Sequence, residues 1–80
     1  MEITVIGGGN GAYAAAVDLT ENGHHVRLWR RDKDSFQEVI QTQAINVKDH
    51  KGSRTVLLKL ASTDLKEVVA GAELIVIPLP

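Results

Sequence analysis

The sequence predicts an α/β fold built on a parallel sheet, and three observations near its start predict it. The β-branched run from Glu2 to Ile6 has the composition of a strand buried on both faces. A glycine turn follows at once, residues 7–12 with the sequence GGGNGA, and an alanine-rich helical segment comes after it. A second apolar strand begins at Val26, where a βαβ unit of about 30 residues requires it. We therefore expect the first half of a doubly wound, Rossmann-like sheet.

The glycine turn has the residue types that a dinucleotide phosphate site needs. Gly7 allows a tight reversal after the strand, and Gly9 lacks the Cβ that would keep the backbone away from a pyrophosphate. Ala12 takes the third position, where a small residue lets the helix lie close to the sheet. The amides around Asn10 and Gly11 then point at the phosphates, and the helix dipole favours their negative charge. The alternative is a glycine turn that joins strand to helix without a ligand.

Composition and charge exclude several other classes of protein. With 80 residues the chain is at most one small domain, and 44% hydrophobic with 24% charged residues is typical of a soluble globular one. A net charge of -1 gives no electrostatic reason to expect nucleic acid or an anionic membrane as a partner. There is no cysteine, which excludes disulfides and thiolate metal sites and fits a reducing cytoplasm. The apolar runs are only strand-sized and no signal peptide precedes the first strand, so we expect a cytoplasmic protein.

The first predicted helix runs from about Gly11 to Asn22, with Ala12, Ala16 and Leu19 on the face against the sheet and Gly23 as a left-handed stop. His24 and His25 lead into the second strand. Adjacent strand residues face opposite sides, so this pair does not predict a metal site.

The end of the second strand carries the prediction about cofactor type. In an NAD site an acid stands there and binds the ribose hydroxyls, and it would repel a 2′-phosphate. Here Arg30 takes that place with Arg31 beside it, and guanidinium groups bind phosphate in a forked geometry. The sequence thus favours NADP(H) over NAD(H). It also argues against FAD, because FAD sites have an acidic residue at the end of the second strand as well. The alternative is a solvated charge cluster in which Asp32 turns in to bind the ribose.

The remaining elements complete the sheet. A capping box at Ser35 predicts a short second helix with Phe36 on its buried face. Next comes a hairpin, whose arms are residues 44–48 and 54–60 around Gly52, and the third strand of the sheet follows from it. Asp64 caps a helix from Leu65 to Ala70 that Gly71 ends, and the fourth strand is residues 73–77. Right-handed crossovers give the spatial order 3-2-1-4 with an inserted β-hairpin.

Four further residues have a chemical alternative to a structural role. Tyr13, on the first helical turn, can reach the phosphate rim, although packing or surface exposure is favoured. Trp29 is expected to fill the core, with a position beside adenine as the alternative. Asp18 and His50 are expected to be solvated, on a helix face and at the hairpin tip.

Several segments together resemble the amino-terminal domain of the opine (octopine) dehydrogenases, which share a wider group with the NAD(P)-dependent glycerol-3-phosphate dehydrogenases and the ketopantoate reductases. The segments are residues 5–12, 18–19, 23–29, 63–65 and 72–78, and the resemblance covers essentially the whole chain. The Gly-Asn-Gly step and the hairpin favour the opine branch. The resemblance implies an enzyme that condenses an amino acid with a 2-keto acid and reduces the imine by hydride from the nicotinamide.

The same resemblance implies roles for particular residues. The pyrophosphate is expected at Gly7, Gly9, Asn10, Gly11 and Ala12, the ribose end at Arg30 and Arg31, and the ribose and nicotinamide beside Pro78 and Leu79. The family's catalytic histidine and acid lie in a carboxy-terminal helical domain that residues 1–80 do not contain, so no catalytic residue is assigned. Residues 1–80 are then a partial NAD(P)-binding domain, and a small-molecule substrate binds only with the other domain present.

Two alternatives and one consequence follow. The chain is alternatively a nucleotide-sensing module that catalyses nothing, or part of a glycerol-3-phosphate dehydrogenase or ketopantoate reductase. The outer edge of the fourth strand, Leu74 to Ile77, is apolar and is left without a neighbour. We therefore expect the isolated chain to form a homodimer through that edge or to be marginally stable.

Overall fold

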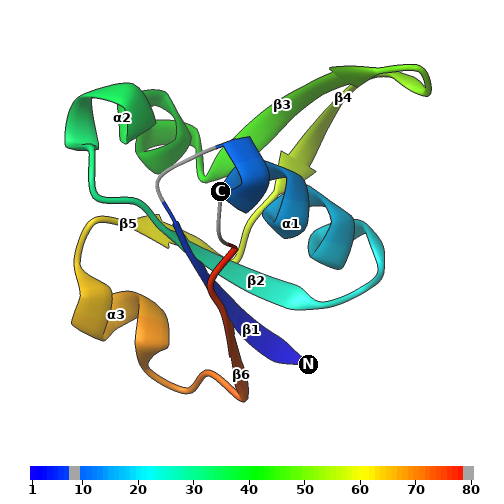
Figure 1. The fold of residues 1–80 in the computed structure, drawn as a ribbon. Coiled ribbons are helices and arrows are strands. Elements are labelled where there is room, and N and C mark those ends of the chain that lie inside the picture. Colours follow the sequence, from blue (N-terminus) through cyan, green and yellow to red (C-terminus); the bar gives the residue numbers. More distant parts are fainter. Residues whose placement is uncertain (8–9, 79–80) are drawn as a thin grey trace.

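The computed structural model describes residues 1–7 and 10–78, which form a parallel sheet with helices on both faces and a separate hairpin (Figure 1). Four parallel strands are ordered β5-β2-β1-β6, and β3 and β4 form the antiparallel hairpin. This confirms the predicted fold class and the order 3-2-1-4. In chain order the elements are β1 (Glu2–Ile6), α1 (Asn10–Glu21), β2 (His25–Trp29), α2 (Lys33–Thr42), β3 (Ala44–Asp49), β4 (Gly52–Leu57), β5 (Leu60–Ser62), α3 (Leu65–Val69) and β6 (Leu74–Val76).

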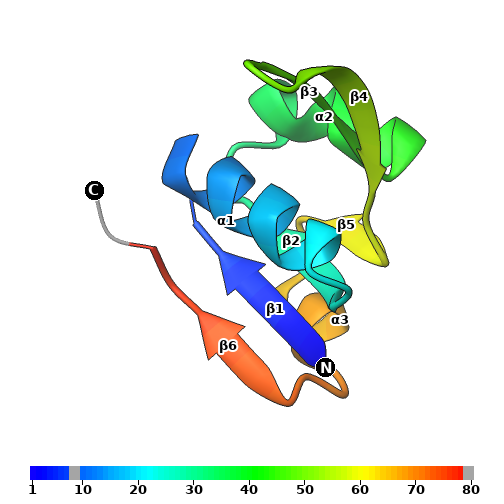
Figure 2. The ribbon, with the colours of Figure 1, turned by 90° about the vertical axis from the view of Figure 1, so that its right-hand side faces the viewer.

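The central strand β1 lies between β2 and β6 and is covered on both faces. Its residues alternate between the faces, as in any strand. Ile3 and Val5 belong to the buried cluster that includes Ala12 and Ala16 of α1. Thr4 is fully buried on the other face, where its hydroxyl donates a hydrogen bond to the Val68 carbonyl of α3 at 2.5 Å. Figure 2 shows the two helices on opposite sides of the sheet.

The second helix begins earlier than the capping box predicts. Asp32 is its N-cap, and its carboxylate accepts from the backbone amide of Asp34 at 3.1 Å. The Ser35 hydroxyl instead donates to the Asp32 carbonyl at 3.3 Å, one turn into the helix. The prediction that Ser35 opens this helix was therefore wrong, because Asp32, three residues earlier, caps it. Phe36 is fully buried, as predicted.

The second arm of the hairpin is shorter than predicted, because the chain changes its partner inside the expected strand. β4 pairs with β3 only as far as Leu57, and the Leu58 amide donates to the Gln43 carbonyl at 2.9 Å. The Lys59 amide already donates to Val26 of β2, and β5 then runs beside β2. One apolar stretch of sequence therefore supplies strands to two different sheets.

The fourth strand of the sheet lies at its edge, as expected. β6 pairs with β1 through three residues, and Leu74 and Ile75 are 47% and 48% exposed. In Figure 2 its outer side faces away from the rest of the described chain. No helix among residues 1–7 and 10–78 is long and apolar enough to cross a membrane.

Candidate functional site

The site is centred on the junction of β1 and α1, which pack closely at the carboxyl edge of the sheet. The Gly7 amide donates to the Trp29 carbonyl at 3.1 Å, which fixes the end of β1 against β2. A Cβ placed on Gly7 would lie 2.9 Å from the Cβ of Ala12, closer than side chains tolerate. Ala12 itself is 2% exposed. Both positions are therefore small because helix and strand touch there.

The first turn of α1 has the electrostatic character of an anion site. Asn10 begins the helix and no acidic residue lies in its first turn. The first amides of a helix have no partner within it, and the dipole gives that end a partial positive charge. Gly11 is exposed. The positions expected to hold the pyrophosphate are thus together at one helix end, except that Gly9 lies outside the described residues.

The carboxyl end of β6 reaches the same place. A Cβ on Gly11 would lie 3.8 Å from the Pro78 Cβ, and one on Gly7 would lie 3.8 Å from the Pro78 Cδ. Pro78 is therefore next to the glycine turn, where a residue bordering the ribose and nicotinamide is expected. Leu79, predicted beside it, lies outside the described residues.

Arg30 is buried beside α1, which the sequence does not indicate. Arg30 is only 8% exposed, and its guanidinium carbon lies 4.3 Å from the centroid of the Tyr13 ring. The Tyr13 ring in turn packs against Phe36, with centroids 6.4 Å apart and ring planes at 50°. Arg31 is exposed. Arg30 is therefore not part of a solvated charge cluster. In the other alternative, Asp32 would have to bind the ribose with the same carboxylate that caps α2.

Trp29 is half-buried at the end of β2, and its indole Nε1 donates to the Thr63 carbonyl at 2.9 Å. This bond joins the end of β2 to the loop before α3. The ring is thus held at the carboxyl edge of the sheet by a contact that needs no ligand.

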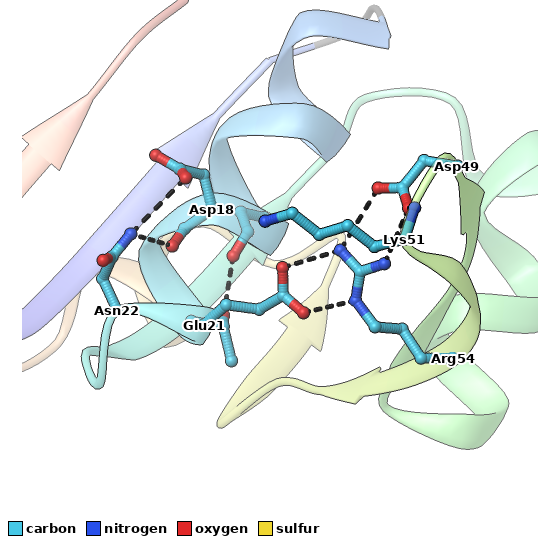
Figure 3. A network of polar contacts seen from close by, with 8 residues as sticks. Asp18, Glu21, Asn22, Asp49, Lys51 and Arg54 are labelled. Atoms are coloured by element: carbon cyan, nitrogen blue, oxygen red, sulfur yellow. Dashed lines mark hydrogen bonds and ion pairs between the residues drawn. The ribbon is translucent and has the colours of Figure 1, made fainter.

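A network of ion pairs lies between α1 and the hairpin (Figure 3). The Arg54 guanidinium donates to both carboxylate oxygens of Glu21 and to Asp49, with an Nη1–Oδ1 distance of 2.9 Å. We call these three residues the hairpin clamp. Hydrogen bonds from Arg54 hold the pKa of Glu21 and of Asp49 below the usual range, and the two carboxylates raise the pKa of Arg54. The sequence does not predict this contact.

A cleft of about 430 Å³ opens beside the hairpin clamp. Its walls include Tyr13 and Asp18 of α1 and His50 at the hairpin tip. Asp18 and His50 are exposed, as expected for solvated positions. The cleft lies along α1 on the hairpin side rather than above the glycine turn.

A second charge cluster lies at the opposite, amino-terminal edge of the sheet. The Glu2 carboxylate accepts from Lys59 at 2.6 Å, from Arg27 at 2.8 Å and from His25 at 2.5 Å, and these four residues form the Glu2 cluster. Hydrogen bonds, first from Lys59 and then from His25, lower the pKa of Glu2 to about 2. Among the residues that the structure describes, no group of three or more histidine or acidic side chains could hold a metal ion. The cluster is a structural ion pair network that joins β1, β2 and the residue before β5.

Comparison with known proteins gives a family match and several similar enzymes. Residues 2–80 match the family described as "NAD-dependent glycerol-3-phosphate dehydrogenase N-terminus". The glycerol-3-phosphate dehydrogenase [NAD(P)+] of Thermoanaerobacter sp. (strain X514) is 36% identical over 80 residues, 100% of this chain and 24% of that protein. The enzyme of the same name from Azotobacter vinelandii is 44% identical over 78 residues, 98% of this chain and 23% of that protein. The one from Pseudomonas fluorescens is 40% identical over 78 residues, 98% of this chain and 22% of that protein. The chain thus spans about a quarter of the length of these relatives.

These matches correct the choice of branch. They support the wider group but not its opine branch, which the Gly-Asn-Gly step and the hairpin favoured. The Gly-Asn-Gly step belongs to the expected dinucleotide site and the hairpin has no assigned ligand, so neither indicates which substrate the dinucleotide serves.

Proposed function

The chain belongs to the family of NAD-dependent glycerol-3-phosphate dehydrogenase N-termini, and we propose that it is the part of such an enzyme that binds the nicotinamide dinucleotide. One observation carries this proposal. The close contact of Gly7 with Ala12 brings the amino end of α1, which has no acid in its first turn, against the carboxyl edge of a parallel sheet. That edge is where open α/β sheets bind their ligands.

The residues of the junction fit a pyrophosphate. Gly7 and Ala12 have no side-chain atoms beyond Cβ, so the backbone can approach the phosphates, and the first amides of α1 supply donors. We assign the pyrophosphate to Gly7, Gly9, Asn10, Gly11 and Ala12. Pro78 and Leu79 are assigned to the ribose next to the nicotinamide, supported by the contact of Pro78 with the turn.

We further propose that the dinucleotide is preferentially NADP(H), with NAD(H) as a weaker ligand. Arg30 and Arg31 stand where NAD sites have an acid, and the nearby Asp32 carboxylate is engaged in capping α2. A guanidinium pair would bind the 2′-phosphate. The relatives are named for NAD(P)+, which includes both dinucleotides.

The reaction of the whole protein is then the oxidation of glycerol 3-phosphate or the reverse reduction, as the names of the relatives state for them. The nicotinamide supplies the hydride acceptor or donor. The chain contributes binding and orientation, and the catalytic groups are assigned to the remaining three-quarters of such an enzyme. We favour this reaction over the opine reaction and over a sensor without catalysis because the three relatives named above are glycerol-3-phosphate dehydrogenases.

The test is a calorimetric titration of the whole protein with NADP+ and NAD+, repeated on Gly11→Asp and on Gly11→Asn as the uncharged control of similar shape. A Cβ at Gly11 makes only ordinary contact with Pro78, so both variants can fold. A carboxylate in the first turn would repel the pyrophosphate, so Gly11→Asp should bind both dinucleotides about tenfold more weakly than Gly11→Asn. Absence of binding by the unaltered protein, or equal affinities of the two variants, would contradict the proposal. Turnover of glycerol 3-phosphate with each dinucleotide then tests the reaction.

A further inference from the structure

We propose that Tyr13 is a positioning residue for cofactor choice, whose ring fixes the Arg30 guanidinium in the orientation that distinguishes a 2′-phosphate from a 2′-hydroxyl. The inference rests on the proposed binding of NADP(H) and names the residue that makes Arg30 selective. Sequence reasoning gives Tyr13 a packing role or a contact with the phosphate rim, neither of which involves Arg30.

The contact is a cation–π interaction in a confined place. The Arg30 guanidinium carbon lies 4.3 Å from the Tyr13 ring centroid, within the range of such interactions, and the arginine is only 8% exposed. Tyr13 is half-buried and packs with Phe36, which is fully buried on α2. The ring therefore has a fixed wall behind it, and Arg30 lies between the end of β2 and the first turn of α1.

The chemistry of the guanidinium group makes this contact useful for phosphate binding. Stacking on a ring uses the flat face of the group, whereas phosphate and carboxylate bind through its in-plane N–H bonds. An arginine already held against a ring loses less side-chain freedom when the ligand binds. Because Tyr13 follows Gly11 and Ala12 on the same helical turn, the ring also sets the distance between Arg30 and the proposed pyrophosphate site.

Arg31 provides a contrast on the same loop. It is exposed, and a solvated charge attracts a phosphate without fixing its position. We therefore expect Arg30 to carry the selectivity and Arg31 to add an attraction that salt screens.

The experiment measures Kd for NADP+ and NAD+ with the whole protein, with Tyr13→Phe, with Tyr13→Leu and with Arg31→Ser. Tyr13→Phe keeps the ring and should keep the ratio of the two Kd values. Tyr13→Leu keeps an apolar side chain but removes the ring, and it should weaken NADP+ binding about tenfold while NAD+ binding changes less than twofold. Arg31→Ser should weaken NADP+ binding only at low salt.

Retained NAD+ binding by Tyr13→Leu shows that the variant is folded. The measured quantity is therefore the ratio of the Kd values for NADP+ and NAD+, and not one affinity alone. Equal weakening of both dinucleotides, or no change in either, would overturn the positioning role while leaving NADP(H) binding intact. Failure of the unaltered protein to prefer NADP+ would overturn the cofactor proposal and this inference with it. Loss of the ratio in Tyr13→Phe would assign the effect to the hydroxyl and would also overturn the inference.

Discussion

Replacing Gly7 by alanine tests the contact on which the site depends. The added Cβ would lie 2.9 Å from the Ala12 Cβ, which is attached directly to the helix backbone and cannot rotate away. The helix or the strand must shift, and overpacking of this kind costs about 1–3 kcal/mol. Hydrogen exchange of the amides of β1 and α1 in the whole protein should become faster, by the factor that this loss of stability implies.

The matched control moves the methyl group from one side of the contact to the other. Ala12→Gly alone should destabilise α1 by about 0.5–1 kcal/mol, because glycine is a poorer helix residue. In the double variant Gly7→Ala with Ala12→Gly, the new Cβ has room. The double variant should therefore lose less stability than the sum of the losses of the two single variants, by about 1 kcal/mol or more. Strict additivity, or a Gly7→Ala variant as stable as the unaltered protein, would refute the steric argument.

Three other predictions concern the ion pairs and the sheet edge. Glu2→Gln should lower the free energy of unfolding at neutral pH, because it removes the charged carboxylate of the Glu2 cluster. The difference in this free energy from the unaltered protein should disappear as the pH falls from about 4.5 towards 2, where the Glu2 carboxylate of the folded protein becomes protonated. Unfolding measured against pH checks this, and a difference that stays constant with pH would contradict it. Arg54→Met should speed hydrogen exchange of β3 and β4 by releasing the hairpin clamp, and unchanged rates would show that apolar packing alone holds the hairpin. The isolated 80-residue chain should self-associate through β6 in sedimentation experiments and Ile75→Lys should reduce this, whereas a monomer at high concentration argues against that edge as an interface.

The parts of the fold that follow from local signals could be predicted from the sequence. Gly23 and Gly71 end their helices with φ of 91° and 77°, and Asp64 caps α3 through the Lys66 amide. The strand order followed from the right-handed crossover rule together with the doubly wound pattern that the glycine turn indicates. These features depend on residues close together in sequence or on a rule of chirality.

The features that could not be predicted depend on distances set by packing. Asp32 and Ser35 are both residue types that cap helices, and the sequence pattern does not show that α2 begins at the earlier one. The run from Arg54 to Leu60 has one composition throughout, although it serves two sheets. The Tyr13–Arg30 contact and the hairpin clamp each join side chains from elements whose relative placement no local pattern records.

The position of β6 has a consequence for how the chain folds during synthesis. β1 pairs with β2 on one side and with β6 on the other, yet β6 begins at Leu74, long after β2 has ended at Trp29. At about 5–20 residues per second, a ribosome needs a few seconds to make the intervening segment. Throughout that interval one edge of β1 has no backbone partner from its own sheet, so β1 can mispair until β6 emerges.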